Sequence, residues 1–170
     1  GGRCPCRRVG GSLSIVVGAG MSHVANLKKL ARDADNPYVM PHVRDAVMGA
    51  FSRAGVDLAG IDGIETHDCF TASEYLAIDH IGLTAPGESW KAIESGDIAM
   101  GGKLPINPSG GLIGGGHPVG ASGVRMLLDA AHQVTGTAGG FQVEGASRFA
   151  TLNFGGSTAT TVSFVVDAVS

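Results

Sequence analysis

The chain has 170 residues and a formal net charge of −3, and 16% of its residues are charged while 44% are hydrophobic. This length is enough for one domain with a hydrophobic core. The low net charge and the lack of a basic run argue against nucleic-acid binding, and no apolar stretch approaches the roughly 18 residues of a membrane span. The three cysteines are an odd number, which argues against a disulfide framework and favours a reducing compartment.

The N-terminal part of the chain predicts one strand and one helix. Residues 1–10 form an irregular lead-in, whose two cysteines lack further ligands at the spacing of a metal site. Residues 12–19 are rich in β-branched side chains and bounded by glycines, which predicts a strand, and a polar, irregular segment follows over 21–40. The apolar period over 41–54 predicts a helix that ends at the next glycine. His42 in its first turn is expected to be exposed to solvent.

The motif HDCF, residues 67–70, follows a short predicted strand over 63–66 and precedes a predicted helix that ends at Gly82. Thr71 and Glu74 have the spacing of a capping box at the start of this helix. The end of a strand just before a helix is where α/β sheets commonly hold ligand-binding groups. The motif therefore makes His67, Asp68 and Cys69 candidate site residues, although a structural role is preferred for Asp68.

A glycine-rich segment, NPSGGLIGGGHPVGASG over 107–123, holds seven glycines in seventeen residues. Apolar residues at helical spacing predict a helix over 119–134 (Val124, Leu127, Leu128, Ala131). Pro118 suits the first helical position, so His117 is expected in a turn at a helix N-terminus, where negative charge is favoured. So many glycines in one place are typical of backbone that turns sharply or approaches a ligand.

This segment could also cradle a phosphate, because it contains spacings similar to GxGxxG. It is not a Walker A loop, since no Gly-Lys-Ser/Thr follows. A dinucleotide-binding fingerprint belongs at the first strand–helix turn, whereas this segment comes late in the chain. No cofactor is assigned to it, and the glycines next to the suspected site are Gly110, Gly111, Gly114, Gly115 and Gly116.

The C-terminal residues predict two strands, over 147–154 and 158–166, that form an antiparallel hairpin around Gly155 and Gly156. With a short helix around 90–94, the order is β, α, β, α, short α, α, β, β. This order predicts an α/β layered domain with a mixed sheet.

Cys69, His67 and His117 are the chemical candidates. A thiol near an imidazole can lose its proton or shuttle one at neutral pH. A buried structural cysteine beside unrelated histidines remains the alternative, and a zinc site lacks a clear fourth ligand. The Gly155 N–H group can either belong to an ordinary turn or point at an oxyanion.

Three segments in this order, HDCF (67–70), NPSGGLIGGGHPVGASG (107–123) and TLNFGGS (151–157), resemble the C-terminal half of a thiolase. The HDCF motif makes the chain most similar to the branch related to the thiolase domain of sterol carrier protein X. The resemblance implies a thiolase C-terminal domain over 11–170, in which helices cover a five-stranded mixed sheet. It also implies acyl-CoA and coenzyme A as substrates, and no permanently bound cofactor or metal.

The resemblance implies a role for each candidate. His117 matches the histidine that activates the nucleophilic cysteine and contributes to an oxyanion hole. His67 stands where an asparagine usually positions a water in that hole, and Gly155 matches a glycine of the second oxyanion hole. Asn153 stands at the place of the usual acid/base cysteine, so Cys69 is the acid/base candidate.

The family's nucleophilic cysteine lies in the N-terminal half, which this sequence does not contain. The expected function is therefore that of the C-terminal half of an acyl-CoA thiolase, an acyltransferase that needs its N-terminal half, in the same chain or another. The alternatives are a non-catalytic module that binds acyl-CoA or a partner protein, and a thiolase-like aldolase subunit. The complete protein is expected to be a homo-oligomer. The last three residues, AVS, are not an SKL signal, so a cytoplasmic location is expected.

Overall fold

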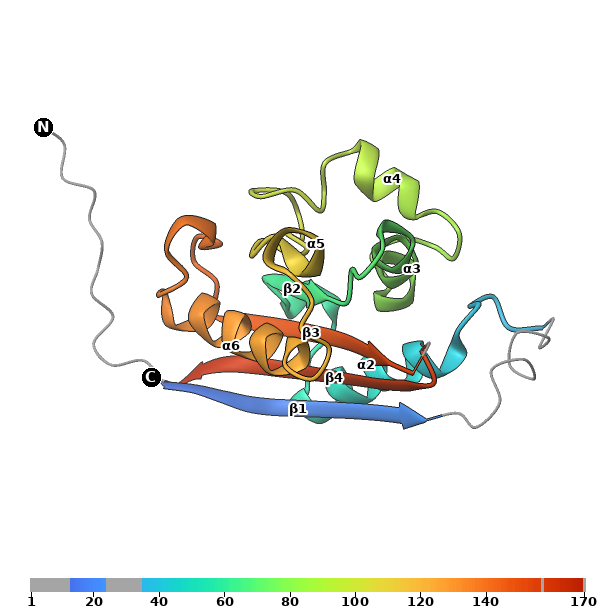
Figure 1. Cartoon of the computed structure of the whole chain (residues 1–170), viewed down its shortest axis with the longest axis horizontal. Coiled ribbons are helices and arrows are strands. Elements are labelled where there is room, and N and C mark those ends of the chain that lie inside the picture. Colours follow the sequence, from blue (N-terminus) through green and yellow to red (C-terminus); the bar gives the residue numbers. More distant parts are fainter. Residues whose placement is uncertain (1–12, 24–34, 157, 170) are drawn as a thin grey trace, which may run out of the picture.

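A computed structural model describes residues 13–23, 35–156 and 158–169, so the expected lead-in over 1–10 lies outside the described residues. The predicted order of the main elements is confirmed (Figure 1). The strands are β1 (Leu13–His23), β2 (Gly63–Thr66), β3 (Arg148–Gly155) and β4 (Thr160–Val169). The helices are α2 (Pro41–Ala54), α3 (Thr71–Ile81), α4 (Ser89–Glu94), α5 (Gly111–Gly115) and α6 (Ser122–Thr135), with single 3-10 turns η1 (Leu58–Gly60) and η2 (Gly139–Phe141).

The four described strands form one mixed sheet in the order β1-β4-β3-β2. β4 is antiparallel to both β1 and β3, whereas β2 is parallel to β3. The sheet has one strand fewer, among the described residues, than the five that the thiolase resemblance implies. At the outer side of β2, Ile106 forms a single parallel bridge with Ile64. The pairing goes no further because Pro105 has no N–H group and Asn107 turns the chain at a φ of 51°.

Helices cover both faces of this sheet, in a three-layer arrangement. Figure 1 shows α6 on the near side of β3 and β4, while α2 lies behind them. The larger hydrophobic core combines buried side chains of α2, α3 and one face of the sheet. A smaller core joins Ala130 and Val134 of α6 to Phe149 and Val166 on the opposite face. Neighbouring strand residues such as Phe149 and Ala150 enter different cores because strand side chains alternate between faces.

β1 packs closely on α2 because two of its residues are glycines. A Cβ atom on Gly20 would lie 1.8 Å from the Ala46 carbonyl oxygen, and one on Gly18 would lie 2.2 Å from the Ala50 carbonyl oxygen. Any larger residue at either position would push the helix away from the sheet. These glycines therefore set the distance between two layers.

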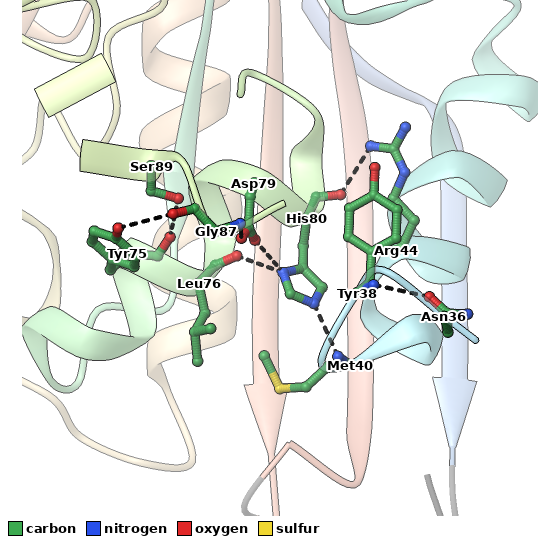
Figure 2. Close-up of polar contacts among 10 residues, drawn as sticks. All are labelled: Asn36, Tyr38, Met40, Arg44, Tyr75, Leu76, Asp79, His80, Gly87 and Ser89. Atoms are coloured by element: carbon green, nitrogen blue, oxygen red, sulfur yellow. Dashed lines mark hydrogen bonds and ion pairs between the residues drawn. The ribbon is translucent and has the colours of Figure 1, made fainter. Parts of the chain in front are cut away.

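A buried histidine ties the start of α2 to the end of α3 (Figure 2). The Met40 N–H donates to His80 Nε2 at 3.0 Å, and His80 Nδ1 lies 2.6 Å from the Leu76 carbonyl oxygen and 2.5 Å from Asp79 Oδ1. Asp79 Oδ2 accepts from the Gly87 N–H at 2.8 Å. The fully buried His80 side chain thus joins three segments of the chain.

Several predictions about the ends of helices and strands are wrong. β1 continues to His23, three residues into the segment that was expected to be irregular. The capping box at Thr71 is not formed: Phe70 is the N-cap, and no side chain caps the helix. His42 is 4% exposed rather than solvated, and its Nε2 lies 2.8 Å from the Thr158 carbonyl oxygen.

The glycine-rich segment also differs from its prediction. Residues 111–115 form the short helix α5, and α6 begins at Ser122 rather than at residue 119. Pro118 is not the first helical residue, because its carbonyl oxygen accepts from the Ala121 and Ser122 N–H groups in a separate turn. His117 therefore lies in the connection between α5 and α6, five residues before α6 begins.

Candidate functional site

The HDCF motif extends beyond the end of β2, next to β3. The His67 N–H still donates to the Leu152 carbonyl oxygen at 2.9 Å, so this residue continues the pairing of the two parallel strands. Asn107 closes the other side, since its Oδ1 accepts from the Thr66 N–H at 2.7 Å and its Nδ2 donates to Glu74 Oε1 at 3.0 Å. These bonds fix where the motif leaves the sheet.

Two buried carboxylates hold the glycine-rich segment beside this motif. Asp68 Oδ1 accepts from the Leu112 N–H at 2.6 Å, and a Cβ atom on Gly111 would lie 2.1 Å from Asp68 Oδ2. Glu65 accepts from Ser109 twice, from the N–H at 3.2 Å and from Oγ at 2.7 Å. Burial raises the pKa of Glu65 from 4.5 to about 7, although the two Ser109 bonds oppose this shift.

The histidine of the HDCF motif and the histidine of the glycine-rich segment lie against each other. The rings of His67 and His117 have centroids 5.0 Å apart at an interplanar angle of 89°. His67 Nδ1 is 2.6 Å from Asn153 Oδ1, and His117 Nδ1 is 2.8 Å from Ser122 Oγ. Burial lowers the pKa of His67, and the neighbouring His117 adds to this shift, so the neutral imidazole is favoured.

Cys69 is partly exposed next to these rings. Within the described residues, the hydrogen-bond partner of its sulfur is Ser73 Oγ at 3.6 Å, one turn along the start of α3. No direct bond joins the Cys69 thiol to His67 or His117 in this part of the chain. A bound substrate or water would have to connect them for proton transfer.

One cavity of about 700 Å³ brings together Cys69, both histidines and Gly155. Its wall is completed by residues from α3, the α5–α6 connection and the β3–β4 hairpin (Phe70, Ser73, Val119, Asn153, Phe154, Gly156, Thr158, Thr160, Val162). Thr158 has a φ of 72°, and its carbonyl oxygen is held by His42. The cavity therefore lies where β2 and β3 end, beside the turn between β3 and β4. Sites at such edges are common in α/β sheets.

The glycines expected near the site do not line this cavity in the described structure. Gly110, Gly111, Gly114, Gly115 and Gly116 lie on its flank, where Asp68 and Glu65 anchor the segment that leads to His117. Gly111 allows a close approach, since it has a φ of 61° and faces the Asp68 carboxylate, whereas a Cβ atom on Gly114 or Gly116 would meet no atom within 4 Å.

The cavity can support proton transfer and stabilise negative charge. It offers two imidazoles, one thiol and the backbone around Gly155 within a partly enclosed space. In the described ranges, no three His, Cys, Asp or Glu side chains converge on a point that could hold a metal ion. None of the described helices has the length and apolar character to cross a membrane.

Sequence reasoning missed the partners of the two histidines. Ser122, which bonds to His117, belongs to the GASG run and is the first residue of α6. A polar serine at the start of a helix was the local feature that could have pointed to this contact. Asn153 was noted as a replacement of a cysteine but not as the partner of His67. The structural role preferred for Asp68 is supported by its bond from the Leu112 N–H in the first turn of α5.

Comparison with known proteins gives the family of the chain. The family model described as "Thiolase C-terminal domain-like" matches residues 25–168. An acetyl-CoA acetyltransferase of Methanothermobacter thermautotrophicus is 40% identical over 116 residues, which are 68% of this chain and 30% of that protein. Sterol carrier protein 2 of Bos taurus is 42% identical over 103 residues, which are 61% of this chain and 19% of that protein.

One further relative and one solved structure are less similar in sequence. The benzoylsuccinyl-CoA thiolase subunit BbsB of Thauera aromatica is 34% identical over 100 residues, covering 59% of this chain and 26% of that subunit. A chain of a solved structure, the Ltp2-ChsH2(DUF35) aldolase, has a TM-score of 0.76 at 20% identity, over 91% of this chain and 39% of that one. This likeness shows the fold alone.

The matched region is thus a minority of each relative's length, between 19% and 30% of the curated proteins named above. The family model nevertheless matches most of this chain, and residues 25–168 include the HDCF motif, the glycine-rich segment and the final hairpin up to residue 168. The chain belongs to the thiolase C-terminal domain-like family.

Proposed function

We propose that this chain is the C-terminal half of an acyl-CoA thiolase and acts with an N-terminal half that supplies the nucleophilic cysteine. In thiolysis, that thiolate attacks the 3-keto carbon of a 3-ketoacyl-CoA. The bond between the α and β carbons breaks, the α carbon takes a proton, and acetyl-CoA leaves. The thiol of free coenzyme A then attacks the acyl-enzyme and releases the shortened acyl-CoA.

The observation that carries this proposal is the convergence of Cys69, His67, His117 and Gly155 on one cavity. Of these, His117 would take the proton of the nucleophilic thiol and, once protonated, donate to the thioester oxyanion. Cys69 would give the α carbon its proton, or remove it in the reverse Claisen condensation. Removal of one oxyanion-hole donor typically costs about 2.7–4 kcal/mol of transition-state stabilisation.

His67 and Gly155 would stabilise negative charge at two separate oxygens. His67 would hold a water against the thioester oxygen, which becomes the enolate oxygen of the leaving acetyl-CoA, and the Gly155 N–H would donate to the oxyanion that forms when the thiolate attacks the 3-keto carbon. Gly155 is exposed and has free space where a side chain would be, since the nearest atom to a Cβ there would be the Thr160 carbonyl oxygen at 3.9 Å. The cavity is therefore open beside this residue.

The surface of α6 supports the proposed pairing with an N-terminal half. Part of the apolar stripe that predicted this helix faces solvent, with Val124 71% and Leu128 52% exposed. Together with exposed Ile15 and Val16 of β1, it lines an apolar groove of about 320 Å³. Contiguous exposed apolar surface of this kind is typical of a protein–protein or domain interface.

The experiment that tests the proposal joins this chain to the part of the Methanothermobacter acetyl-CoA acetyltransferase that precedes the matched region. Assembly is first checked by size-exclusion chromatography and circular dichroism. Acetoacetyl-CoA cleavage by free coenzyme A is then followed by the loss of the 3-ketoacyl-CoA absorbance. The proposal predicts turnover that His117→Ala abolishes, whereas His132→Ala, which alters a histidine in the last turn of α6, leaves it unchanged.

An assembled protein without thiolysis would contradict the thiolase proposal. If it still bound acyl-CoA, a non-catalytic binding module would be the better description. Cleavage of an aldol substrate instead of acetoacetyl-CoA would favour an aldolase subunit. The three outcomes differ in measured product, so one series of assays separates them.

A further inference from the structure

Asn153 makes a short contact with His67 that the sheet itself creates. Because β2 and β3 run parallel, the His67 N–H bonds to the Leu152 carbonyl oxygen, which places the next residue on β3 beside the imidazole. The Asn153 Oδ1 atom lies 2.6 Å from His67 Nδ1. This residue stands where the thiolase resemblance puts an acid/base cysteine, and an amide cannot replace a thiol in proton transfer.

The amide determines which ring nitrogen of His67 carries the proton. An amide oxygen only accepts hydrogen bonds, so the contact requires a proton on Nδ1. Nε2 of the neutral ring then carries a lone pair and acts as an acceptor. Gly123 leaves room for the amide group beside His67, because a Cβ atom there would lie 2.4 Å from Asn153 Nδ2.

The second histidine reaches the same tautomer through a different partner. The Ser122 hydroxyl donates to the Pro118 carbonyl oxygen at 3.2 Å, so its oxygen is left to accept from His117 Nδ1 at 2.8 Å. Both rings therefore use Nδ1 as a donor to the protein. In each neutral ring, Nε2 remains as the nitrogen that can accept a proton or a hydrogen bond.

We propose that Asn153 is a positioning residue that holds His67 as the Nδ1–H tautomer, with Nε2 as a hydrogen-bond acceptor for a water in the cavity. A water that donates one proton to Nε2 directs its other proton toward a substrate oxygen. His67 would thus act on an oxyanion through that water and not by direct donation. The catalytic meaning of this arrangement rests on the proposed thiolase function, but the tautomer does not.

Long-range ¹H–¹⁵N NMR spectra of the histidine rings test this inference on the 170-residue chain itself. The His67 signals are identified by their loss in His67→Gln. The wild-type spectrum is expected to show Nδ1 protonated and Nε2 unprotonated for neutral His67. A neutral His67 with the proton on Nε2 would overturn the proposal, whatever the activity of the assembled protein.

Two variants separate the effect of Asn153 from a general loss of structure. Asn153→Ala is expected to move His67 toward the Nε2–H tautomer that free histidine favours, and to leave the His117 signals unchanged. Ser122→Ala is expected to move His117 toward the Nε2–H tautomer and to leave the His67 signals unchanged. Asn153→Asp keeps an acceptor, so it should retain the Nδ1–H tautomer and raise the pH midpoint of His67, because a carboxylate stabilises the imidazolium. An unchanged His67 spectrum in Asn153→Ala would contradict the inference.

The assembled thiolase of the previous section supplies a second readout. Asn153→Ala is expected to lower kcat several-fold with little change in KM, and Asn153→Asp is expected to shift the pH profile of kcat to higher pH. If the assembled protein is inactive, the thiolase proposal fails while the tautomer result stands. If it is active and kcat is unchanged by Asn153→Ala, the positioning role fails even where the tautomer is as proposed.

Discussion

The Nδ1 atom of His117 lies 2.8 Å from the Oγ atom of Ser122, the first residue of α6. Since the serine hydroxyl donates to Pro118, this contact fixes both the tautomer and the direction of the imidazole. We expect Ser122→Ala to lower the kcat of an assembled thiolase about fivefold, because one hydrogen bond of about 1 kcal/mol orients the ring. Steady-state acetoacetyl-CoA cleavage measures this effect.

Ser89→Ala is the matched control for that variant. Ser89 is also a buried serine at the start of a helix, and its Oγ donates to the Tyr75 carbonyl oxygen at 2.6 Å, in a region outside the site (Figure 2). Ser89→Ala should lower the free energy of unfolding about as much as Ser122→Ala does and leave kcat unchanged. An equal loss of kcat in both variants would show that Ser122 acts only through stability.

Burial of Glu65 predicts that the stability of the fold depends on pH. Its pKa is raised from 4.5 to about 7, so the folded state binds a proton more tightly than the unfolded state does. The stabilisation is complete below the unfolded pKa of 4.5 and is lost as the pH rises through about 7. The loss amounts to on the order of 3 kcal/mol, since one pKa unit corresponds to about 1.4 kcal/mol.

Glu65→Gln should remove this part of the pH dependence while keeping an acceptor for the Ser109 N–H. Urea unfolding at several pH values between 4.5 and 8 measures it. The variant should gain stability relative to the wild type as the pH rises, whereas Glu94→Gln, at an exposed position on α4, should not. A constant difference between variant and wild type across this pH range would contradict the assignment.

The close contact between α5 and Asp68 predicts a sharp difference between two glycines of one helix. Gly111 has a φ of 61°, and its Cβ atom would lie 2.1 Å from Asp68 Oδ2, whereas a Cβ atom on Gly114 would have no atom within 4 Å. We expect Gly111→Ala to lower the free energy of unfolding by more than about 2 kcal/mol. Gly114→Ala should be neutral or slightly stabilising. Chemical denaturation of both variants tests this, and similar values would contradict the contact.

The apolar groove beside α6 is the proposed interface with the N-terminal half, so a charge placed in it should weaken assembly of the two halves. Leu128→Lys places an ammonium group on the proposed interface, at a side chain that is 52% exposed in this chain. Ile93→Lys makes the same change at a 48% exposed side chain on α4. We expect the first variant to weaken binding to a separately expressed N-terminal half at least about tenfold, and the second to have no effect. Equal binding by both variants would place the interface elsewhere.

The sequence predicts α2 and β2 well, because local signals and tertiary packing agree there. The apolar period of α2 becomes its buried face, and Gly55 ends the helix at a φ of 68°. β2 is buried along its full length, as expected for a strand paired in parallel. The HDCF residues therefore leave the sheet where the sequence predicts.

Long-range contacts explain the local errors. Glu74 bonds to Asn107 rather than to the start of α3, so no capping box forms. The carboxylate of Asp68, which is 44 positions away along the sequence, holds the first turn of α5, and no local pattern could reveal that helix. The apolar stripe of α6 correctly predicts a helix, but only part of it is buried. Leu127 packs against the smaller core and Val124 and Leu128 are exposed, because the buried face of the helix is formed by Met126, Ala130 and Val134.

Sequence motifs could suggest which side chains gather in this cavity, but not how they are connected. The family motifs identify His67, Cys69, His117 and Gly155, and these residues share one cavity. The pairing of His67 with Asn153 spans 86 residues and depends on the parallel register of β2 and β3. Such a register is set by the whole sheet, so sequence spacing alone could not supply it.

Proton exchange at the α carbon of acetyl-CoA tests the proposed acid/base role of Cys69 most directly. The assembled protein is incubated with acetyl-CoA in D₂O, and deuterium in the acetyl group is measured by mass spectrometry. The wild type should incorporate deuterium, while Cys69→Ala should lose exchange and still form the acyl adduct on the N-terminal cysteine. Exchange at the wild-type rate in Cys69→Ala would contradict the claim and assign the proton transfer to another group.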